Sequence, residues 1–144
     1  MRRVGDAAEE KTGSRPHPAV GALVRDAQQL LRGSDFEGAL DLYQRAASLD
    51  PARIELEGYV DLLRSRLVKS YRERIGDPAR VPKLLVPPAQ VTRFNLPADA
   101  GFVLSMIDGR TSFEELLSVT GMGPFEALRI FARLLDAGIV GVAA

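Results

Sequence analysis

Length, composition and charge limit what this chain can be. It has 144 residues, of which 46% are hydrophobic, enough for the core of one domain or of two small helical units. Its 19 basic and 19 acidic residues balance to a net charge of zero, so no overall charge attracts it to nucleic acid or to an anionic membrane. It contains no cysteine, which excludes disulfides and thiolate metal sites and suits a cytoplasmic location.

The N-terminal residues 1–18 are predicted to form a disordered tail. They are polar and include glycines and prolines, so they cannot bury an apolar face. No apolar stretch follows the basic start, so we expect no secretion signal, and no run approaches the roughly 18 apolar residues of a membrane span. His17, the only histidine, falls in this tail without a second group to orient it, so we expect no catalytic role for it.

Hydrophobic periodicity predicts a helical region at 19–76. Its three helices are expected at 19–31, 35–49 and 52–75. Gly33 should end the first helix, and Ser34 with Glu37 matches a capping box at the start of the second. Pro51 ends the second helix, because the residue before a proline is pushed out of the helical region.

The first helix pair has small residues where two helices would cross closely and large apolar residues beside them. The small ones are Ala27, Ala39 and Ala46; the large ones are Leu23, Leu30, Phe36 and Tyr43. With Pro51 at its end, this pattern over 20–51 resembles a tetratricopeptide repeat, although Leu23 stands where that family has a tryptophan. Stacks of such repeats usually need about three units, so we expect the third helix to cap the pair, or a second copy of the chain to pair with it.

The segment 77–96 is rich in proline and is predicted to be an extended connector. Its apolar piece, 84–86, is expected to pack against a helix. The C-terminal part is expected to pack on the rest of the chain through this piece and the apolar stripe at 102–107, because a three-helix unit of that size buries little surface alone.

Residues 97–144 are predicted to form three short helices. The inward stripe of the first is expected at Phe102, Val103, Met106 and Ile107. Thr111 with Glu114 predicts a second capping box, and Pro124 begins the last helix. Residues 139–142 are β-rich and predict one short edge strand.

Two runs in this part, 102–117 and 127–140, resemble a winged-helix-like module found at the end of multidomain bacterial signalling proteins. The resemblance implies a fold and not an activity, because related three-helix units bind DNA in some proteins and other proteins elsewhere. The expected fold is therefore mostly all-α: a tetratricopeptide-like hairpin with a capping helix, then a winged-helix-like three-helix unit with at most a short strand.

We find no motif in the sequence that is typical of a catalytic site. Residues 121–124 are rich in glycine before a helix, but the lysine of a phosphate-binding loop is absent. The adjacent carboxylates of Glu114 and Glu115 would point to different sides of a helix, so they form no acid–base pair. We therefore expect a protein that is not an enzyme and that holds no cofactor or metal.

Charge is distributed unevenly along the chain. The segment 64–83 is strongly basic, whereas the parts before and after it are net acidic. This segment is either a docking surface for an acidic partner or a phosphate backbone, or a solvated helix face, and we favour the solvated face. A partner peptide would span the first helix and this segment. The residues expected to contact it are Arg25, Gln28, Gln29 and Arg32 on the first helix and Arg64, Arg66, Lys69 and Arg72 on the third.

The function expected from these patterns is that of a non-catalytic adaptor or scaffold in bacterial signalling or regulation. Its partner would be another protein or peptide of acidic character, or a second copy of the chain. The alternative is a DNA-binding regulator that reads DNA with the helix at 124–137. That helix offers only Arg129 and Arg133 as basic side chains, with Glu126 and Asp136 beside them, so nucleic acid is not the expected partner.

Overall fold

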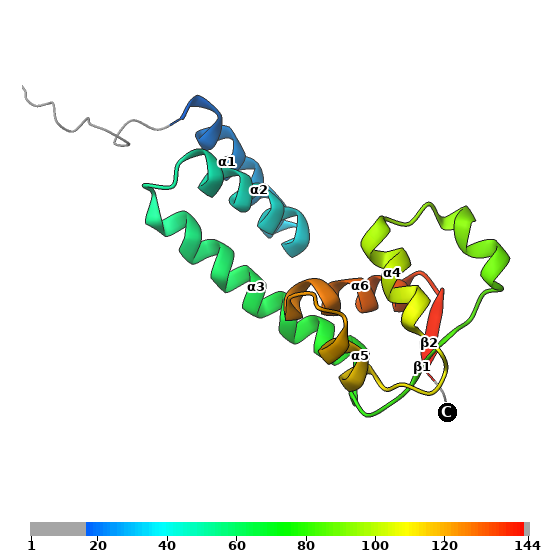
Figure 1. The fold of residues 1–144 in the computed structure, drawn as a ribbon. Helices are drawn as coiled ribbons and strands as arrows, with labels where there is room; N and C mark the ends of the chain where they lie inside the picture. Colours follow the sequence, from blue (N-terminus) through cyan, green and yellow to red (C-terminus); the bar gives the residue numbers. More distant parts are fainter. Residues whose placement is uncertain (1–16, 143–144) are drawn as a thin grey trace, which may run out of the picture. The chain divides into compact units, whose positions relative to one another are not determined.

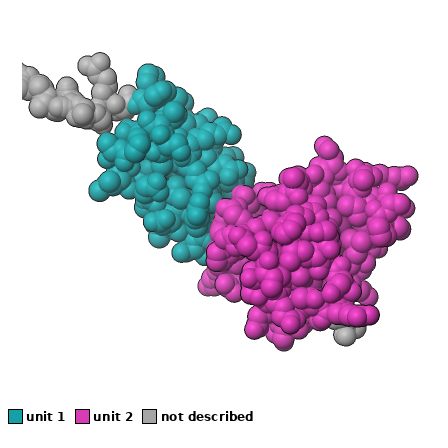
Figure 2. Space-filling model, viewed as in Figure 1, with its two compact units in different colours: residues 1–67 teal, residues 68–144 magenta. Residues whose placement is uncertain are grey.

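The structure is a computed structural model that describes residues 17–142. Helices make up most of the described chain, and two short strands form its sheet (Figure 1), which confirms the mostly all-α expectation. The chain divides into two compact units, residues 1–67 and 68–144 (Figure 2). The division falls inside the third helix, so the proline-rich segment 77–96 belongs to the C-terminal unit.

The N-terminal unit contains α1 (Pro18–Arg32), α2 (Phe36–Leu49) and the first part of α3 (Ile54–Ile75). His17 is the N-cap of α1, because its Nδ1 accepts a hydrogen bond from the Ala19 backbone N–H at 3.1 Å. His17 and Pro18 therefore belong to a helix end and not to a tail. The rest of the predicted tail, residues 1–16, lies outside the described residues.

The turn between α1 and α2 differs from the predicted capping box. Ser34 adopts a left-handed backbone with φ of 63°. Its N–H donates to the carbonyl of Leu31 at 3.0 Å, and that of Asp35 donates to the carbonyl of Leu30 at 2.8 Å, which satisfies the last carbonyls of α1. Asp35 then caps α2 by accepting from the Gly38 N–H at 2.9 Å. The capping box at Ser34 and Glu37 is wrong, because Ser34 is needed to close the preceding helix.

Small buried residues let α1 and α2 pack closely. Ala27, Ala39 and Ala46 are all fully buried. Along α3, the Tyr59 ring packs on Tyr43 with centroids 5.0 Å apart, and burial, with a smaller contribution from Tyr59, raises the pKa of the Tyr43 hydroxyl. These contacts join α2 to α1 and to α3. The tetratricopeptide assignment itself stays a prediction.

The C-terminal unit packs around one central helix. It contains the end of α3 and six further elements: β1 (Pro82–Leu84), the 3-10 helix η1 (Pro88–Phe94), α4 (Ala98–Met106), α5 (Phe113–Val119), α6 (Pro124–Asp136) and β2 (Val140–Val142). On α6, Phe131 meets Phe113 edge-on at 5.3 Å and Phe125 meets Tyr71 at 5.8 Å. These aromatic pairs join α3 and α5 to α6.

The strand expected at the C-terminus is β2, and its partner β1 comes from the proline-rich segment. The two pair antiparallel, with Lys83 opposite Gly141. A side chain on Gly141 would come within 2.8 Å of the Leu85 side chain, which would have to shift to make room. Leu85 itself is 53% exposed, which contradicts the expectation that all of 84–86 packs inward.

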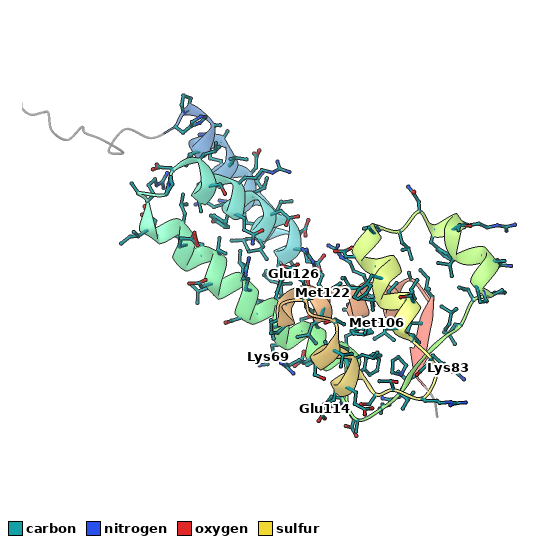
Figure 3. All side chains as sticks on the ribbon, in the orientation of Figure 1. Lys69, Lys83, Met106, Glu114, Met122 and Glu126 are labelled. Atoms are coloured by element: carbon teal, nitrogen blue, oxygen red, sulfur yellow. The ribbon has the colours of Figure 1, made fainter. Side chains whose placement is uncertain are left out.

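Two predictions for the C-terminal unit, the capping box of α5 and the inward stripe of α4, each differ from the structure by a small displacement along the chain. The capping box of α5 joins Ser112 and Glu115, and not Thr111 and Glu114 as predicted. Thr111 is not available because both its N–H and its hydroxyl donate to Asp108. Glu114 lies on α5 (Figure 3) and takes no part in the box. In α4 the buried residues include Val103, but Phe102 is 47% exposed. This helix is apolar on most sides, so packing and not periodicity decides which side faces inward.

Candidate functional site

The residues predicted to contact a partner are all exposed on their helices. Four of them lie on α1, where Arg32 donates to Gln29 at 2.6 Å. On α3, Arg64 and Arg66 are two residues apart and therefore point to nearly opposite sides of the helix. Lys69 (Figure 3) and Arg72 continue this spread. The basic residues wrap around α3 and do not gather on one face, which supports the solvated-face interpretation.

Arg66 and Arg64 meet different neighbours within the N-terminal unit. The Arg66 guanidinium lies over the Phe36 ring, 4.4 Å from its centroid. Arg64 lines an open, mostly polar hollow of about 360 Å³ together with Gln44, Ser48 and Glu57. Such a shallow polar hollow does not enclose a ligand.

The C-terminal unit contains a more enclosed cavity of about 390 Å³, which we call the α4–α6 pocket. Its volume falls in the range of ligand pockets in proteins, about 300–1,000 Å³. Its lining is mainly apolar and is formed by Leu96, Pro97, Ala100, Ile130, Leu134, Ala137 and Ile139, with Asp99, Arg129 and Arg133 as the charged residues.

Two helices and the chain segments that adjoin them position this lining. α4 lies against α6 (Figure 1), and Asn95 in a left-handed conformation turns the chain from η1 towards α4. The residues from α6 follow helical spacing, so they present one continuous side to the pocket. After α6, Gly138 with φ of 74° reverses the chain and buries Ile139 in the wall.

Charged side chains stand beside the apolar lining of the pocket. Arg129 donates to Glu126 at 2.9 Å and lies over the Phe125 ring at 5.3 Å, so its guanidinium is held in place. Arg133 lies one turn further along α6, and Asp99 is the opposing charge from α4. With Glu126, which pairs with Arg129, counted beside Asp99, two arginines and two carboxylates stand at this edge of the pocket. The apolar wall can take an aliphatic or aromatic side chain, and the arginines can bind a carboxylate.

The sequence did not predict this pocket. Its residues come from 96–100 and 129–139, and nothing in either segment alone indicates that the two meet. The available signal was the spacing of Arg129 and Arg133 beside Ile130 and Leu134, which places charges along the edge of an apolar helix face. From the sequence alone, Arg129 and Arg133 bear only on DNA binding.

The side of α6 that faces solvent is electrically balanced. Its stripe reads Glu126, Arg129, Arg133 and Asp136, and seven other residues of the helix are buried. Asp136 accepts a hydrogen bond from Arg74 at 2.6 Å. Because acidic groups stand at both ends of the stripe, α6 offers no basic face to a phosphate backbone.

Within residues 17–142, no cluster of three or more potential metal ligands occurs, and no helix is long and apolar enough to cross a membrane. No protein family, no curated protein and no solved structure was found to match this chain.

Proposed function

We propose that the protein is a non-catalytic protein-interaction module whose C-terminal unit captures one apolar side chain of a partner, next to a carboxylate. The observation that supports this most is the α4–α6 pocket, in which an apolar wall adjoins Arg129 and Arg133. An apolar anchor that fills a pocket, with charged groups at its edge, is how many peptide-binding surfaces gain both affinity and specificity. A short acidic peptide is therefore the proposed partner, and bacterial signalling or regulation is the proposed setting.

DNA binding receives less support. A recognition helix must present an open basic or amide-rich side to the major groove. The exposed stripe of α6 carries two acidic and two basic residues, and Arg129 already bonds Glu126. A helix whose exposed charges balance would be attracted only weakly to the phosphates of DNA.

The proposal is tested by selecting random peptides displayed on phage against the purified full chain. We expect enriched peptides to share an apolar residue adjacent to Asp or Glu. Binding should then be measured by calorimetry with a synthetic enriched peptide. Ala137→Phe fills the pocket from its exposed C-terminal edge and should weaken that binding at least about tenfold, since a blocked anchor site costs more than about 1.4 kcal/mol.

Arg133→Glu should also weaken binding, whereas Arg110→Glu is the matched control, because Arg110 is an exposed arginine of the same unit that does not line the pocket. Peptide affinities that are equal for all three variants would place binding elsewhere. A selection that enriches no shared apolar–acidic pattern would contradict the proposed ligand.

A further inference from the structure

One stripe of α3 in the N-terminal unit is open to solvent although its centre is apolar. It consists of Glu55, Tyr59, Leu62 and Arg66, which we call the α3 stripe. Spacings of four, three and four residues place these side chains on one side of a helix. Leu62 is 70% exposed and Tyr59 is 44% exposed. These two side chains form an apolar centre with a charged residue at each end of the stripe.

The order of residues in the α3 stripe is self-complementary. From the N-terminal end it reads acidic, aromatic, aliphatic and basic, and its midpoint lies between Val60 and Asp61. When a second α3 runs antiparallel across this midpoint, Glu55 of each copy faces Arg66 of the other. Tyr59 likewise faces Leu62. A two-fold axis through the midpoint therefore pairs every member of the stripe with a suitable partner.

We propose that the α3 stripe is a docking surface for a second copy of this chain, bound antiparallel about that two-fold axis. The spacing is that of the contact positions of a coiled coil, in which antiparallel helices bring such positions together in successive layers. The inner layers are apolar and the outer layers carry opposite charges. This inference is independent of the α4–α6 pocket.

Contacts within one copy of the chain orient side chains of the α3 stripe for this pairing. The Arg66 guanidinium stacks on Phe36 at 4.4 Å, and a stacked guanidinium keeps its N–H donors at the edge of its plane. Tyr59 is braced by Tyr43. Glu55 accepts from the Arg53 Nε at 3.4 Å, a long contact, and a carboxylate has acceptor sites for a second arginine.

The charges favour a second copy over an acidic peptide. An acidic segment laid along the stripe would meet Arg66 favourably but would place a like charge against Glu55. Only a partner with the reversed order of charges satisfies both ends, and the chain itself supplies that order. Because four residues from each helix bury less than a standard interface, the dimer is expected to be weak and to form at micromolar to millimolar concentrations.

Charge exchange between the two ends tests the pairing in the full chain. Sedimentation velocity over that concentration range should show the wild type in monomer–dimer exchange. Glu55→Arg alone places arginine opposite arginine, and Arg66→Glu alone places glutamate opposite glutamate, so each variant should dimerise at least about tenfold more weakly. An equimolar mixture of the two variants should recover dimerisation, because each mixed pair has opposite charges at both ends.

The matched controls are Glu57→Arg and Arg64→Glu, which change the same charges on the opposite side of α3 and should leave dimerisation unchanged. Circular dichroism of every variant checks that the helices remain intact. Recovery in the mixture distinguishes pairing from damage to the fold, which a second damaged chain does not repair. A wild type that stays monomeric at millimolar concentration, or a mixture that dimerises no better than its components, overturns the proposal.

Discussion

Asp108 shows how a single exposed carboxylate organises the loop before α5. It accepts hydrogen bonds from the backbone N–H groups of Arg110 and Thr111 at 2.8 and 2.9 Å, and from the Thr111 hydroxyl at 3.0 Å. These donors favour the ionised form and hold the pKa of Asp108 below its ordinary value. The loop thereby fixes where the capping box of α5 begins.

The lowered pKa of Asp108 gives the loop a defined pH dependence. A carboxyl whose pKa is lower in the folded state stabilises the fold above its unfolded pKa, and this contribution is lost as the pH falls through the folded value. Carboxyl NMR should therefore give a titration midpoint for Asp108 below about 3.9, the value in unstructured peptides. Thr111→Val removes the hydroxyl donor and should raise that midpoint. A midpoint at the ordinary value in the wild type would contradict the hydrogen-bonded loop.

The junction between α1 and α2 carries a backbone conformation that suits glycine better than the residue present. Ser34 has φ of 63°, in the left-handed region where a Cβ is strained. Ser34→Gly should therefore raise the free energy of unfolding by about 0.5–1 kcal/mol, after the greater flexibility of glycine in the unfolded chain is included. Urea unfolding measures the change. The control is Ser48→Gly on the exposed side of α2, which should lower stability by a few tenths of a kcal/mol.

At the scale of elements, the sequence predicted the helices well, and it predicted where they start less well. The spacing of apolar residues predicted the bounds of α1, α2 and α3 to within two residues, because the apolar residues at helical spacing are the ones that pack in the core. Each capping residue was displaced by one position, to Asp35 in α2 and to Ser112 in α5, because Ser34 and Thr111 are engaged by the structure that precedes the helix. The choice among neighbouring capping residues depends on those earlier hydrogen bonds.

Local sequence patterns could not predict which face of α4 is buried or that the α4–α6 pocket forms. In α4 apolar residues occur on both sides, so only contact with α6 decides that Val103 is buried and Phe102 is not. The pocket requires two segments about thirty residues apart to meet, which depends on the complete packing of the unit. The cavity is a property of tertiary structure.

For the whole molecule, the continuity of α3 predicts cooperative unfolding. Four of its residues are buried in one unit, Leu56, Val60, Leu63 and Leu67, and Tyr71 and Ile75 are buried in the other. Melting either unit removes packing from part of the same helix, whose turns are stabilised by their neighbours. Aromatic NMR signals of Tyr43 and Tyr71 should therefore disappear at the same urea concentration. Well-separated midpoints for the two tyrosines would show that the units unfold independently.

The division of α3 between two units also has a consequence for the order in which the chain is made. Synthesis proceeds from the N-terminus at about 5–20 residues per second, so Tyr71 leaves the ribosome seconds before the Phe125 that packs on it. During that interval the N-terminal unit has all of its own residues, but the last turns of α3 expose an apolar side to the cell. The packing of Tyr71 on Phe125 therefore forms only after Phe125 has been added to the chain.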